Sequence, residues 1–462
     1  MKIQLPDKVQ TIIETLTAAG YEAYAVGGCI RDCVLGRLPN DWDITTSATP
    51  EETKRLFART VDTGIKHGTV TILLEKEGFE VTTYRIDGDY EDGRHPKEVT
   101  FTASLEEDLR RRDFTMNAMA YNEQTGLVDI FGGIRDMDAG MIRCVGNAEE
   151  RFTEDALRML RAVRFSAQLG YRIEDGTKEA IRNLAPGLKR ISAERIQTEL
   201  VKLVVSEHPD YLRTAYETGI TKQILPEFDL CMETPQNNPH HCYNVGEHIL
   251  HSMLAVEADK VLRLGMLFHD IGKPQTMTVD AEGITHNKGH AEVGEQMTKQ
   301  ILRRLKFDND TIAAVTKIVR FHDQEVGASP GGVRRAVNRT GEDMFRMLFA
   351  VKRADIAAQS AYLREEKLKK LAYIQELYDG ICRRQECMSL KDLAVTGRDL
   401  IALGMTPGRE IGTLLDRLLE IVLEEPERNT RDELLRICAE KTFCRDLLEK
   451  LHLFFILLAL LS

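Results

Sequence analysis

The spacing of apolar residues divides the chain into an N-terminal part that mixes strands with helices and a longer helical part. Residues 69–74 and 79–86 alternate apolar and polar positions, which predicts two strands. The turns around them are rich in Gly, Asp and Pro. From residue 149 onward the apolar residues recur with helical period, for example over 150–165, 193–205 and 249–268. We therefore expect an α+β head followed by a mostly α-helical remainder.

One segment interrupts the helical part. Residues 233–239 contain two prolines and two asparagines, which disfavour any regular element. With 462 residues available, the chain is long enough for several domains. We predict a head over 1–140, a helical neck over 141–232, a histidine-rich domain over 240–362, and a helical body and tail over 363–462.

The composition is that of an ordinary folded protein, with 43% apolar and 29% charged residues. A net charge of −11 excludes a protein that coats nucleic acid through bulk positive charge, so any contact with nucleic acid must come from local basic residues. The nine cysteines form no CxxC pair, and the first residues lack the pattern of a signal peptide. The apolar run 453–461 is too short to span a bilayer. We expect a cytoplasmic protein without membrane contact.

Candidate chemistry begins in the head. Two glycines at 27–28 stand where an apolar strand turns into a helix, which leaves backbone N–H groups available to an anion. Asp41 and Asp43 follow, and in a strand residues i and i+2 point to the same face. Glu80 alternates with apolar neighbours and is placed to add a third carboxylate. Such a cluster suits Mg²⁺ with a triphosphate, whereas an ordinary loop and an exposed strand position are the alternatives.

Four motifs in order resemble one enzyme family. They are GGCIRD at 27–32, LGRLPNDWD at 35–43, RRRDFTMNAMAYN at 110–122 and EDALRMLRAVRF at 154–165. Together they resemble the class II tRNA nucleotidyltransferases, which comprise the CCA-adding enzymes and their bacterial poly(A) polymerase relatives. The resemblance covers the first 230 residues and resumes near 390.

This resemblance implies a role for each matching residue in two-metal phosphoryl transfer. Asp41 and Asp43 would hold Mg²⁺. Glu80, which is proposed from its strand position and not from the resemblance, would be a third catalytic carboxylate. The residues implied in nucleotide binding are Gly28, Arg31, Arg112, Asp113, Asn117, Asp155, Arg158, Arg161 and Arg164. Among them Arg112 and Asn117 would contact phosphates and Asp113 the ribose. A solvated charge run is the alternative interpretation of residues 110–112.

The last motif predicts how bases are chosen. On a continuous helix Asp155 and Arg158 share one polar face with Arg151, Glu154 and Arg161, and a salt-bridged surface helix is the alternative. Cytosine and adenine present an amino donor beside a ring-nitrogen acceptor, which one carboxylate and one guanidinium can pair with. Uracil and guanine present the opposite polarity. Asp155 and Arg158 are therefore expected to select C and A, while Glu154 holds the helix in place.

Two further segments favour addition of C, C and A to tRNA from CTP and ATP. Residues 63–70 resemble the CCA-adding enzymes, and residues 87–96 resemble the flexible loop expected of enzymes that also add A. A basic GRRF-type sequence, associated with the polymerases, is absent from the sequence. Poly(A) synthesis remains an alternative, as does an RNA-binding protein without enzymatic activity. The sequence does not indicate an oligomeric state.

A second candidate centre lies in the histidine-rich region. His248, His269-Asp270 and Asp355 follow the order H…HD…D and resemble the HD phosphohydrolases, which bind divalent metals; His290 and His322 are possible further ligands. This predicts a second divalent metal whose identity the sequence leaves open. The alternatives are structural histidines, an inactive scaffold, or a phosphohydrolase whose head only binds RNA. Residues 400–412 predict a Gly/Pro turn between helices, either a plain hairpin or a tRNA-facing surface.

Overall fold

The computed structural model describes residues 2–88 and 99–439. Most of the loop expected at 87–96 and the apolar run at 453–461 lie outside the described residues. Contacts between residues group the chain into two compact units. The first unit comprises Met1–Pro235, Asn244–Leu267 and Lys299–Ile312, and the second comprises Gln236–Tyr243, Phe268–Thr298 and Ala313–Ser462. The division into four domains stays a prediction.

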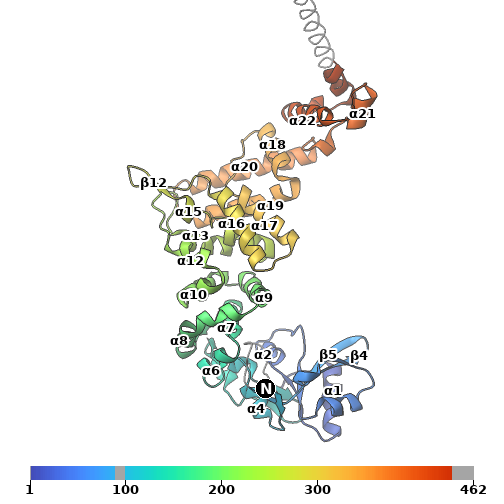
Figure 1. The fold of residues 1–462 in the computed structure, drawn as a ribbon, viewed down its shortest axis with the longest axis vertical. Helices are drawn as coiled ribbons and strands as arrows, with labels where there is room; N and C mark the ends of the chain where they lie inside the picture. The colour runs from blue at the N-terminus through green and yellow to red at the C-terminus, as the bar shows by residue number, and fades with distance from the viewer. Residues whose placement is uncertain (1, 89–98, 440–462) are drawn as a thin grey trace, which may run out of the picture. The chain divides into compact units, whose positions relative to one another are not determined.

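The head of the first unit is built on a seven-stranded mixed sheet with the order β3-β4-β5-β2-β1-β8-β9. Figure 1 labels two of its strands, β4 and β5. Only β2 and β5 run parallel in it, and the other neighbours are antiparallel. The strands are β1 (Ala23–Val26), β2 (Ile44–Thr46), β3 (Thr60–Gly64), β4 (Thr69–Leu74), β5 (Glu77–Thr83), β8 (Ala120–Asn122) and β9 (Gly126–Val128). Strand β1 is buried along its whole length, as a central strand with both faces covered requires.

The two strands predicted from the alternating pattern differ in outcome. The first, at 69–74, is confirmed as β4. The second, at 79–86, is divided between β5 and a separate strand β6 (Arg85–Asp87), which pairs with β7 (Val99–Phe101). Tyr84 lies between β5 and β6, is fully buried, and donates its N–H to the carbonyl of Thr46 at 2.7 Å. Burial of this ring fixes the point where the chain leaves the main sheet.

Short helices accompany the sheet, and their side chains complete its core. They are α1 (Asp7–Ala18), α2 (Gly28–Val34), α3 (Pro50–Leu56), α4 (Leu105–Arg110) and α5 (Gly133–Asp138). Helix α3 begins with a capping box, in which Thr49 and Glu52 satisfy each other's backbone N–H groups. One core cluster joins Tyr24 and Val26 of β1 to Leu109 of α4 and Ala120 of β8. These contacts fix the ends of β1, α2 and α4 relative to one another.

The rest of the first unit is helical, which confirms the expected α+β head followed by a helical region. Its helices include α6 (Ala148–Glu154), α7 (Leu157–Leu169), α8 (Asp175–Leu184), α9 (Ala193–Val204), α10 (Leu212–Glu217), α11 (Thr221–Ile224), α12 (Pro226–Glu233), α13 (Val245–Leu254) and α14 (Lys260–Phe268). Two short strands, β10 (Met141–Ile142) and β11 (Arg172–Ile173), pair in parallel. Helix α7 packs on α9.

The continuous helix expected over 150–165 is wrong. Helix α6 ends at Glu154, and α7 starts at Leu157. Asp155 between them has extended backbone angles, φ −139° and ψ 102°, and its Oδ1 accepts a hydrogen bond from the N–H of Leu157 at 3.0 Å. An aspartate that caps the following helix competes with continuation of the preceding one. The break gives Asp155 a position that no helical face would provide.

Helices also dominate the second unit. Those contained wholly in it are α15 (Lys273–Thr276), α18 (Pro330–Thr340), α19 (Glu342–Ala358), α20 (Arg364–Arg383), α21 (Gly397–Ala402) and α22 (Arg409–Glu424). Helices α16 (His290–Arg304) and α17 (Asn309–Phe321) each contribute residues to both units, and β12 (Thr278–Val279) pairs with β13 (Thr285–His286). The Gly/Pro turn predicted at 400–412 separates α21 from α22. Among the described residues, no helix is long and apolar enough to cross a membrane.

Candidate active site

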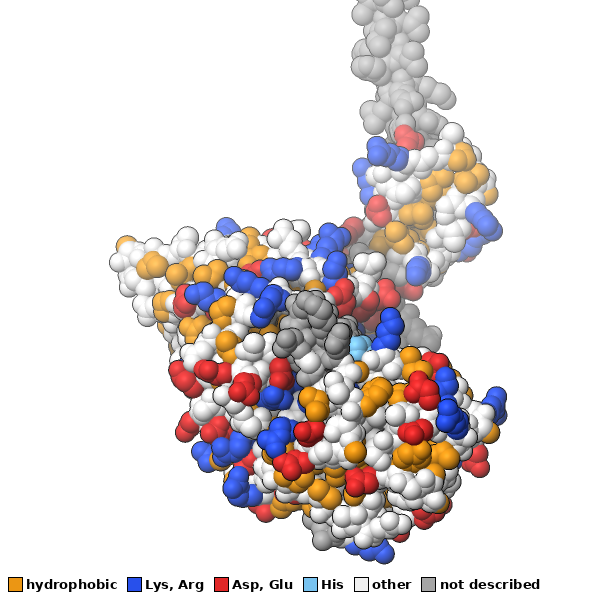
Figure 2. Space-filling model, turned by 60° about the horizontal axis from the view of Figure 1, so that its bottom comes forward, with side chains coloured by type: hydrophobic (Ala, Val, Ile, Leu, Met, Phe, Trp, Pro, Cys, Tyr) orange, Lys and Arg blue, Asp and Glu red, His pale blue; other side chains and the backbone are white. Residues whose placement is uncertain are grey.

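A cleft of about 1000 Å³ in the first unit collects the residues that the head motifs singled out. Its lining comes from the β1–α2 turn, the segment before β2, the loop after α4, and helices α7 and α9. Every residue predicted for metal or nucleotide binding in the head lines this cleft, except Glu80. On the face shown in Figure 2, the described acidic and basic side chains are interspersed, so positive charge for an anionic ligand must come from local groups such as the arginines of this cleft.

The two aspartates stand directly before β2 and not within it. Asp41 and Asp43 lie in the segment that leads into Ile44, and the carbonyl of Asp43 accepts a hydrogen bond from the N–H of Val26 at 3.0 Å. This backbone bond ties the segment to the end of β1. Both carboxylates are solvent-accessible on the cleft wall. The expectation of two carboxylates inside a strand is wrong, although the extended segment presents both to the cleft.

Electrostatics at Asp43 favour a bound cation. Withdrawal from bulk water in the cleft raises the pKa of the Asp43 carboxyl, and although Arg112 opposes this, the charges of Asp41 and Glu80 raise the pKa further. The parallel register of β2 and β5 explains the influence of Glu80. Ile44 pairs with Val81, so the residues before them, Asp43 and Glu80, are neighbours across the two strands. Glu80 is exposed beside the aspartates and lies outside the cleft lining.

The glycine turn brings backbone close to Arg112. Gly27 has φ +85°, and a Cβ added there would lie 2.9 Å from Nη1 of Arg112. Only glycine adopts this conformation readily and leaves that space open. Arg112 is held from its other side by the buried Asp108, 3.5 Å from Nη2, and Asp108 also pairs with Arg111 at 2.7 Å. Asp108 was missed by sequence reasoning, although an aspartate inside a helix followed by three arginines is a signal for such a contact.

A chain of hydrogen bonds connects the predicted nucleotide-binding residues. Arg31 donates from Nη1 to Oδ1 of Asn117 at 2.8 Å, and Asn117 donates from Nδ2 to Oδ1 of Asp113 at 3.0 Å. Arg161 donates from Nε and Nη2 to Oδ2 of Asp113 at 3.0 and 2.6 Å. Burial alone would raise the pKa of Asp113, but Arg161 and the hydrogen bond from Asn117 hold it well below its usual value. Asp113 is therefore a fixed negative charge.

Asp155 and Arg158, which are expected to select the base, each form hydrogen bonds with other residues of the protein. Arg195 of α9 donates from Nη2 to Oδ2 of Asp155 at 2.6 Å. Arg158 donates to Oε2 of Glu154 at 2.6 Å and to the carbonyl of Arg111 at 3.0 Å. Glu154 also pairs with Arg151 at 2.5 Å, which agrees with its expected holding role. Asp155 and Arg158 thus line the cleft from a framework that fixes both side chains.

Helix α9 contributes residues that sequence reasoning missed. Arg195 and Glu199 are one helical turn apart, and Glu199 is buried. Glu199 accepts from Nε of Arg164 at 2.7 Å and lies 3.7 Å from Arg161. Burial lowers the pKa of Arg164 to about 10 although Glu199 opposes the shift. The signal was available, because a glutamate between the apolar residues of an amphipathic helix requires a buried cationic partner.

In the second unit, two histidines and an aspartate form a buried cluster. The Nε2 atoms of His290 and His322 lie 3.1 Å apart, and Oδ1 of Asp270 lies 3.5 and 3.7 Å from them. His269 lies 3.3 Å from Asp270 and 3.8 Å from Asp355. His269, Asp270 and Asp355 are thus brought together as predicted, with the two possible further ligands beside them. His248 belongs to the first unit, and its role stays a prediction.

Hydrogen bonding fixes the tautomers of these two histidines. Nδ1 of His290 contacts the carbonyl of Asn287 and Nδ1 of His322 the carbonyl of Val319, both at 2.8 Å. A carbonyl only accepts, so each Nδ1 carries a proton, and each Nε2 faces the other ring. Burial would raise the pKa of Asp270, but His269 and Lys273 hold it well below its usual value. Two facing Nε2 atoms beside a carboxylate are a donor set for a divalent cation.

Comparison with known proteins places the chain among relatives of one kind. Residues 23–143 match the poly A polymerase head domain, residues 170–232 a probable RNA- and SrmB-binding site of polymerase A, and residues 284–438 a putative tRNA nucleotidyltransferase domain 2. A CCA-adding enzyme of Lactiplantibacillus plantarum is 37% identical over 94% of this chain and 96% of its own length. One of Lactobacillus helveticus is 35% identical over 93% and 96%. The crystal structure of the Bacillus stearothermophilus CCA-adding enzyme in complex with CTP covers 96% of this chain and 99% of its own, at 30% identity and a TM-score of 0.70.

Proposed function

This chain belongs to the family of the CCA-adding enzymes, and from that premise we propose that it adds C, C and A to the 3′ end of tRNA, using CTP and ATP as donors. The reaction joins the terminal 3′-hydroxyl of the RNA to the α-phosphate of the triphosphate and releases pyrophosphate. No nucleic-acid template is required if the protein itself selects the base. We propose a cytoplasmic site of action, where tRNA is available.

The observation that carries the proposal is that carboxylates and guanidinium groups line the same cleft. Asp41 and Asp43 stand on one wall, and the arginines Arg31, Arg112, Arg158, Arg161 and Arg164 stand around them. Carboxylates alone would repel a triphosphate, and arginines alone would bind one without activating it. Phosphoryl transfer needs both, because it depends on positioning and on neutralising charge.

The carboxylates suit Mg²⁺. Asp41, Asp43 and Glu80 offer hard oxygen ligands. The pKa of Asp43 is raised first by withdrawal from water and then by the charges of Asp41 and Glu80, and a cation would offset both effects. When bound, Mg²⁺ supplies activation of the attacking hydroxyl and charge neutralisation at the leaving group. The protein's own part is to hold Asp43 against β1 through its backbone and to place Arg112 opposite it. Glu80 adds negative charge next to Asp43.

Asp155 and Arg158 are proposed to select the base. The Asp155 carboxylate accepts from the amino group of C or A, and the Arg158 guanidinium donates to the ring nitrogen beside it. With U or G both contacts mismatch in polarity, which costs about 1–3 kcal/mol for each unpaired group. Their partners Arg195 and Glu154 hold both groups in place, which makes the mismatch expensive because neither side chain can turn away.

The direct test offers one triphosphate at a time. Purified protein, Mg²⁺ and a tRNA lacking its last three nucleotides are incubated with each labelled triphosphate. CTP alone should extend this tRNA, ATP alone should extend only a tRNA that already ends in CC, and UTP and GTP should give no product. Efficient extension by ATP on every RNA end would favour the poly(A) polymerase alternative. Absence of any extension would reject nucleotidyl transfer.

We propose a second function for the second unit, namely a divalent-metal centre that hydrolyses phosphate esters. The facing Nε2 atoms of His290 and His322 beside Asp270 favour it. Hydrolysis would cleave the P–O ester bond with water, giving phosphate and an alcohol.

Asp270→Ala separates the two proposed functions. We expect loss of tightly held metal, measured by elemental analysis, and loss of phosphate-ester hydrolysis. Addition of C to tRNA should continue, because the cleft lies wholly in the first unit. Glu282→Ala is the control, since it removes an exposed acidic side chain of the same unit that is not part of the cluster. Unchanged metal content in Asp270→Ala would reject the second function.

A further inference from the structure

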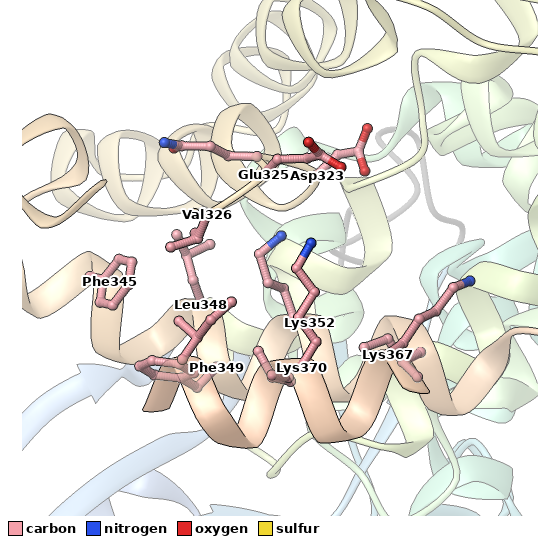
Figure 3. Close-up of a pocket in the computed structure, with 13 residues that line it drawn as sticks. Asp323, Glu325, Val326, Phe345, Leu348, Phe349, Lys352, Lys367 and Lys370 are labelled. Atoms are coloured by element: carbon pink, nitrogen blue, oxygen red, sulfur yellow. The ribbon is translucent and has the colours of Figure 1, made fainter. Parts of the chain in front are cut away.

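A second pocket lies in the second unit, beside the histidine cluster and separate from the cleft. Its volume is about 190 Å³, and it is lined by residues 323–326, by α19 and by α20 (Figure 3). Asp323 directly follows His322 in the chain, and Ile356 directly follows Asp355. Lys352 of the lining donates a hydrogen bond to the carbonyl of His322 at 2.8 Å. The pocket and the cluster therefore share the same supporting backbone.

The two ends of this pocket differ in chemistry. Figure 3 shows Phe345, Phe349, Leu348 and Val326 gathered at one end, with lysine ammonium groups extending from α19 and α20 toward the other. The apolar side chains belong to the core of the second unit, where Phe345 and Phe349 pack edge to face at 5.2 Å between ring centroids. This end presents packed apolar side chains to the pocket. It is suited to a flat or branched apolar group.

The polar end carries more positive than negative charge. Lys352, Lys367 and Lys370 face two exposed carboxylates, Asp323 and Glu325. The ammonium group of Lys367 contacts Nδ1 of His240 at 3.0 Å and donates to the side-chain oxygen of Gln359. Lys352 is half-buried, so an anion in the pocket would compensate a charge that is partly withdrawn from water.

Gln324 adds a polar side chain to the lining. Its side-chain oxygen is buried and has no hydrogen-bond partner among the described residues. A buried polar atom without a partner costs free energy unless a ligand or water satisfies it. A 180° rotation of the Gln324 amide would exchange its oxygen for an N–H donor. The side chain can therefore hydrogen-bond either to an anion or to a hydrogen-bond donor of a ligand.

We propose that this pocket binds a compact phosphate monoester, with its apolar or aromatic group against Phe345, Phe349 and Leu348 and its phosphate among the three lysines. A dianionic phosphate matches an excess of lysines better than a neutral ligand does. The volume lies below the range of roughly 300–1000 Å³ typical of drug-sized ligands, so the occupant must be small. Binding requires no metal; only turnover of this ester would rest on the proposed second function.

Phenyl phosphate is a suitable probe, because it joins one aromatic ring to one dianionic phosphate. The full-length protein is titrated calorimetrically in EDTA with phenyl phosphate, inorganic phosphate and phenol. We expect saturable binding of phenyl phosphate that is at least tenfold tighter than that of either fragment. No saturable binding up to about 10 mM, or equal affinity for phenyl phosphate and inorganic phosphate, would overturn the proposal.

Two adjacent lysines of α20 locate the site. Lys370 lines the pocket, whereas Lys369 does not and has a side chain that is 80% exposed. Lys370→Glu should weaken phenyl phosphate at least tenfold, and Lys369→Glu should change it less than twofold. Equal effects of the two variants would show that the ligand binds elsewhere. Phe345→Leu, checked for folding by thermal unfolding, should weaken phenyl phosphate and leave inorganic phosphate unchanged.

The same experiment keeps the proposals apart. If phenyl phosphate binds with the expected dependence on Lys370 but is not hydrolysed after a divalent metal is restored, the pocket assignment stands and the hydrolytic function fails. If hydrolysis depends on Asp270 while binding ignores Lys370, the pocket assignment fails and the metal centre stands. Neither result bears on addition of C and A, which uses the cleft of the first unit.

Discussion

Arg195 donates a hydrogen bond of 2.6 Å to the carboxylate of Asp155, from a helix that begins almost forty residues later in the chain. Asp155 stands in the break between α6 and α7, and its other oxygen caps α7 through the N–H of Leu157. Both of its oxygens are therefore engaged by the protein. The carboxylate that we propose to read the base is oriented before any nucleotide binds.

Asp155→Ala should relax the choice of base. The substitution removes the acceptor for the amino group of C and A, whereas Asp41, Asp43 and the phosphate-facing arginines remain. One lost hydrogen bond of about 1–3 kcal/mol corresponds to roughly a 5- to 150-fold change in preference. Competition among the four triphosphates measures this change. Glu150→Ala, an exposed change in the first turn of α6, is the control and should leave the preference intact.

Arg195→Ala should also reduce discrimination, because Asp155 would then be free to turn. Since both changes act on one interaction, the double variant Asp155→Ala/Arg195→Ala should discriminate no worse than Asp155→Ala alone. Arg195→Lys should recover part of the loss, because the hydrogen bond to Asp155 comes from a single donor atom, Nη2. Fully additive effects in the double variant would show that the two residues act independently.

Asp43→Asn should separate stability from activity. It removes a charge whose pKa is raised by poor solvation and by its acidic neighbours, so the metal-free head should become more stable at neutral pH. Addition of C should fall at least ~10²-fold, the loss typical of removing one electrostatic partner of a transition state. Trp42 is the sole tryptophan and stands between the two aspartates. Its fluorescence should respond to Mg²⁺ in the parent protein and not in Asp43→Asn; equal responses would place the metal elsewhere.

Asp113→Asn should cost stability in a pH-dependent way. The pKa of Asp113 in the folded state lies below the value of about 3.9 for an unfolded chain, so its contribution is full above that value and is lost as pH falls through the folded pKa. Breaking its buried pair with Arg161 should cost on the order of 3 kcal/mol at pH 6. Urea unfolding followed through Trp42 measures this. A difference between the two proteins that stays constant down to pH 3 would contradict the assignment.

The site residues of the head could be predicted from its motifs, because each motif combines charged residues and glycines that are rarely needed together for folding alone. Asp41, Asp43, Arg112 and Asp113 were predicted from short segments and meet in one cleft. The placement of Arg195 could not be derived in the same way, because its partner Asp155 is distant in sequence and the contact depends on how α9 packs on α7. Asp108, by contrast, pairs with Arg111 and Arg112 within about one helical turn, a spacing that the sequence shows.

The backbone conformation around the site was harder to predict than the residues that form the site. Glu154, Asp155 and Ala156 are all compatible with a helix, so periodicity alone predicted one helix where Asp155 ends α6 and caps α7. Tyr84 divides a predicted strand because its ring is buried where the chain turns away from the sheet. In both places a tertiary contact outweighs local preference.

The most direct measurement of the central claim is the 3′-terminal sequence made when all four triphosphates are present. A tRNA ending at its discriminator base is incubated with the protein and Mg²⁺, and the products are sequenced at their 3′ ends. The account predicts C, then C, then A, and no further extension, from a protein that carries its own base selection at Asp155 and Arg158. Products that end in runs of A, or that contain all four bases in proportion to their supply, would contradict it.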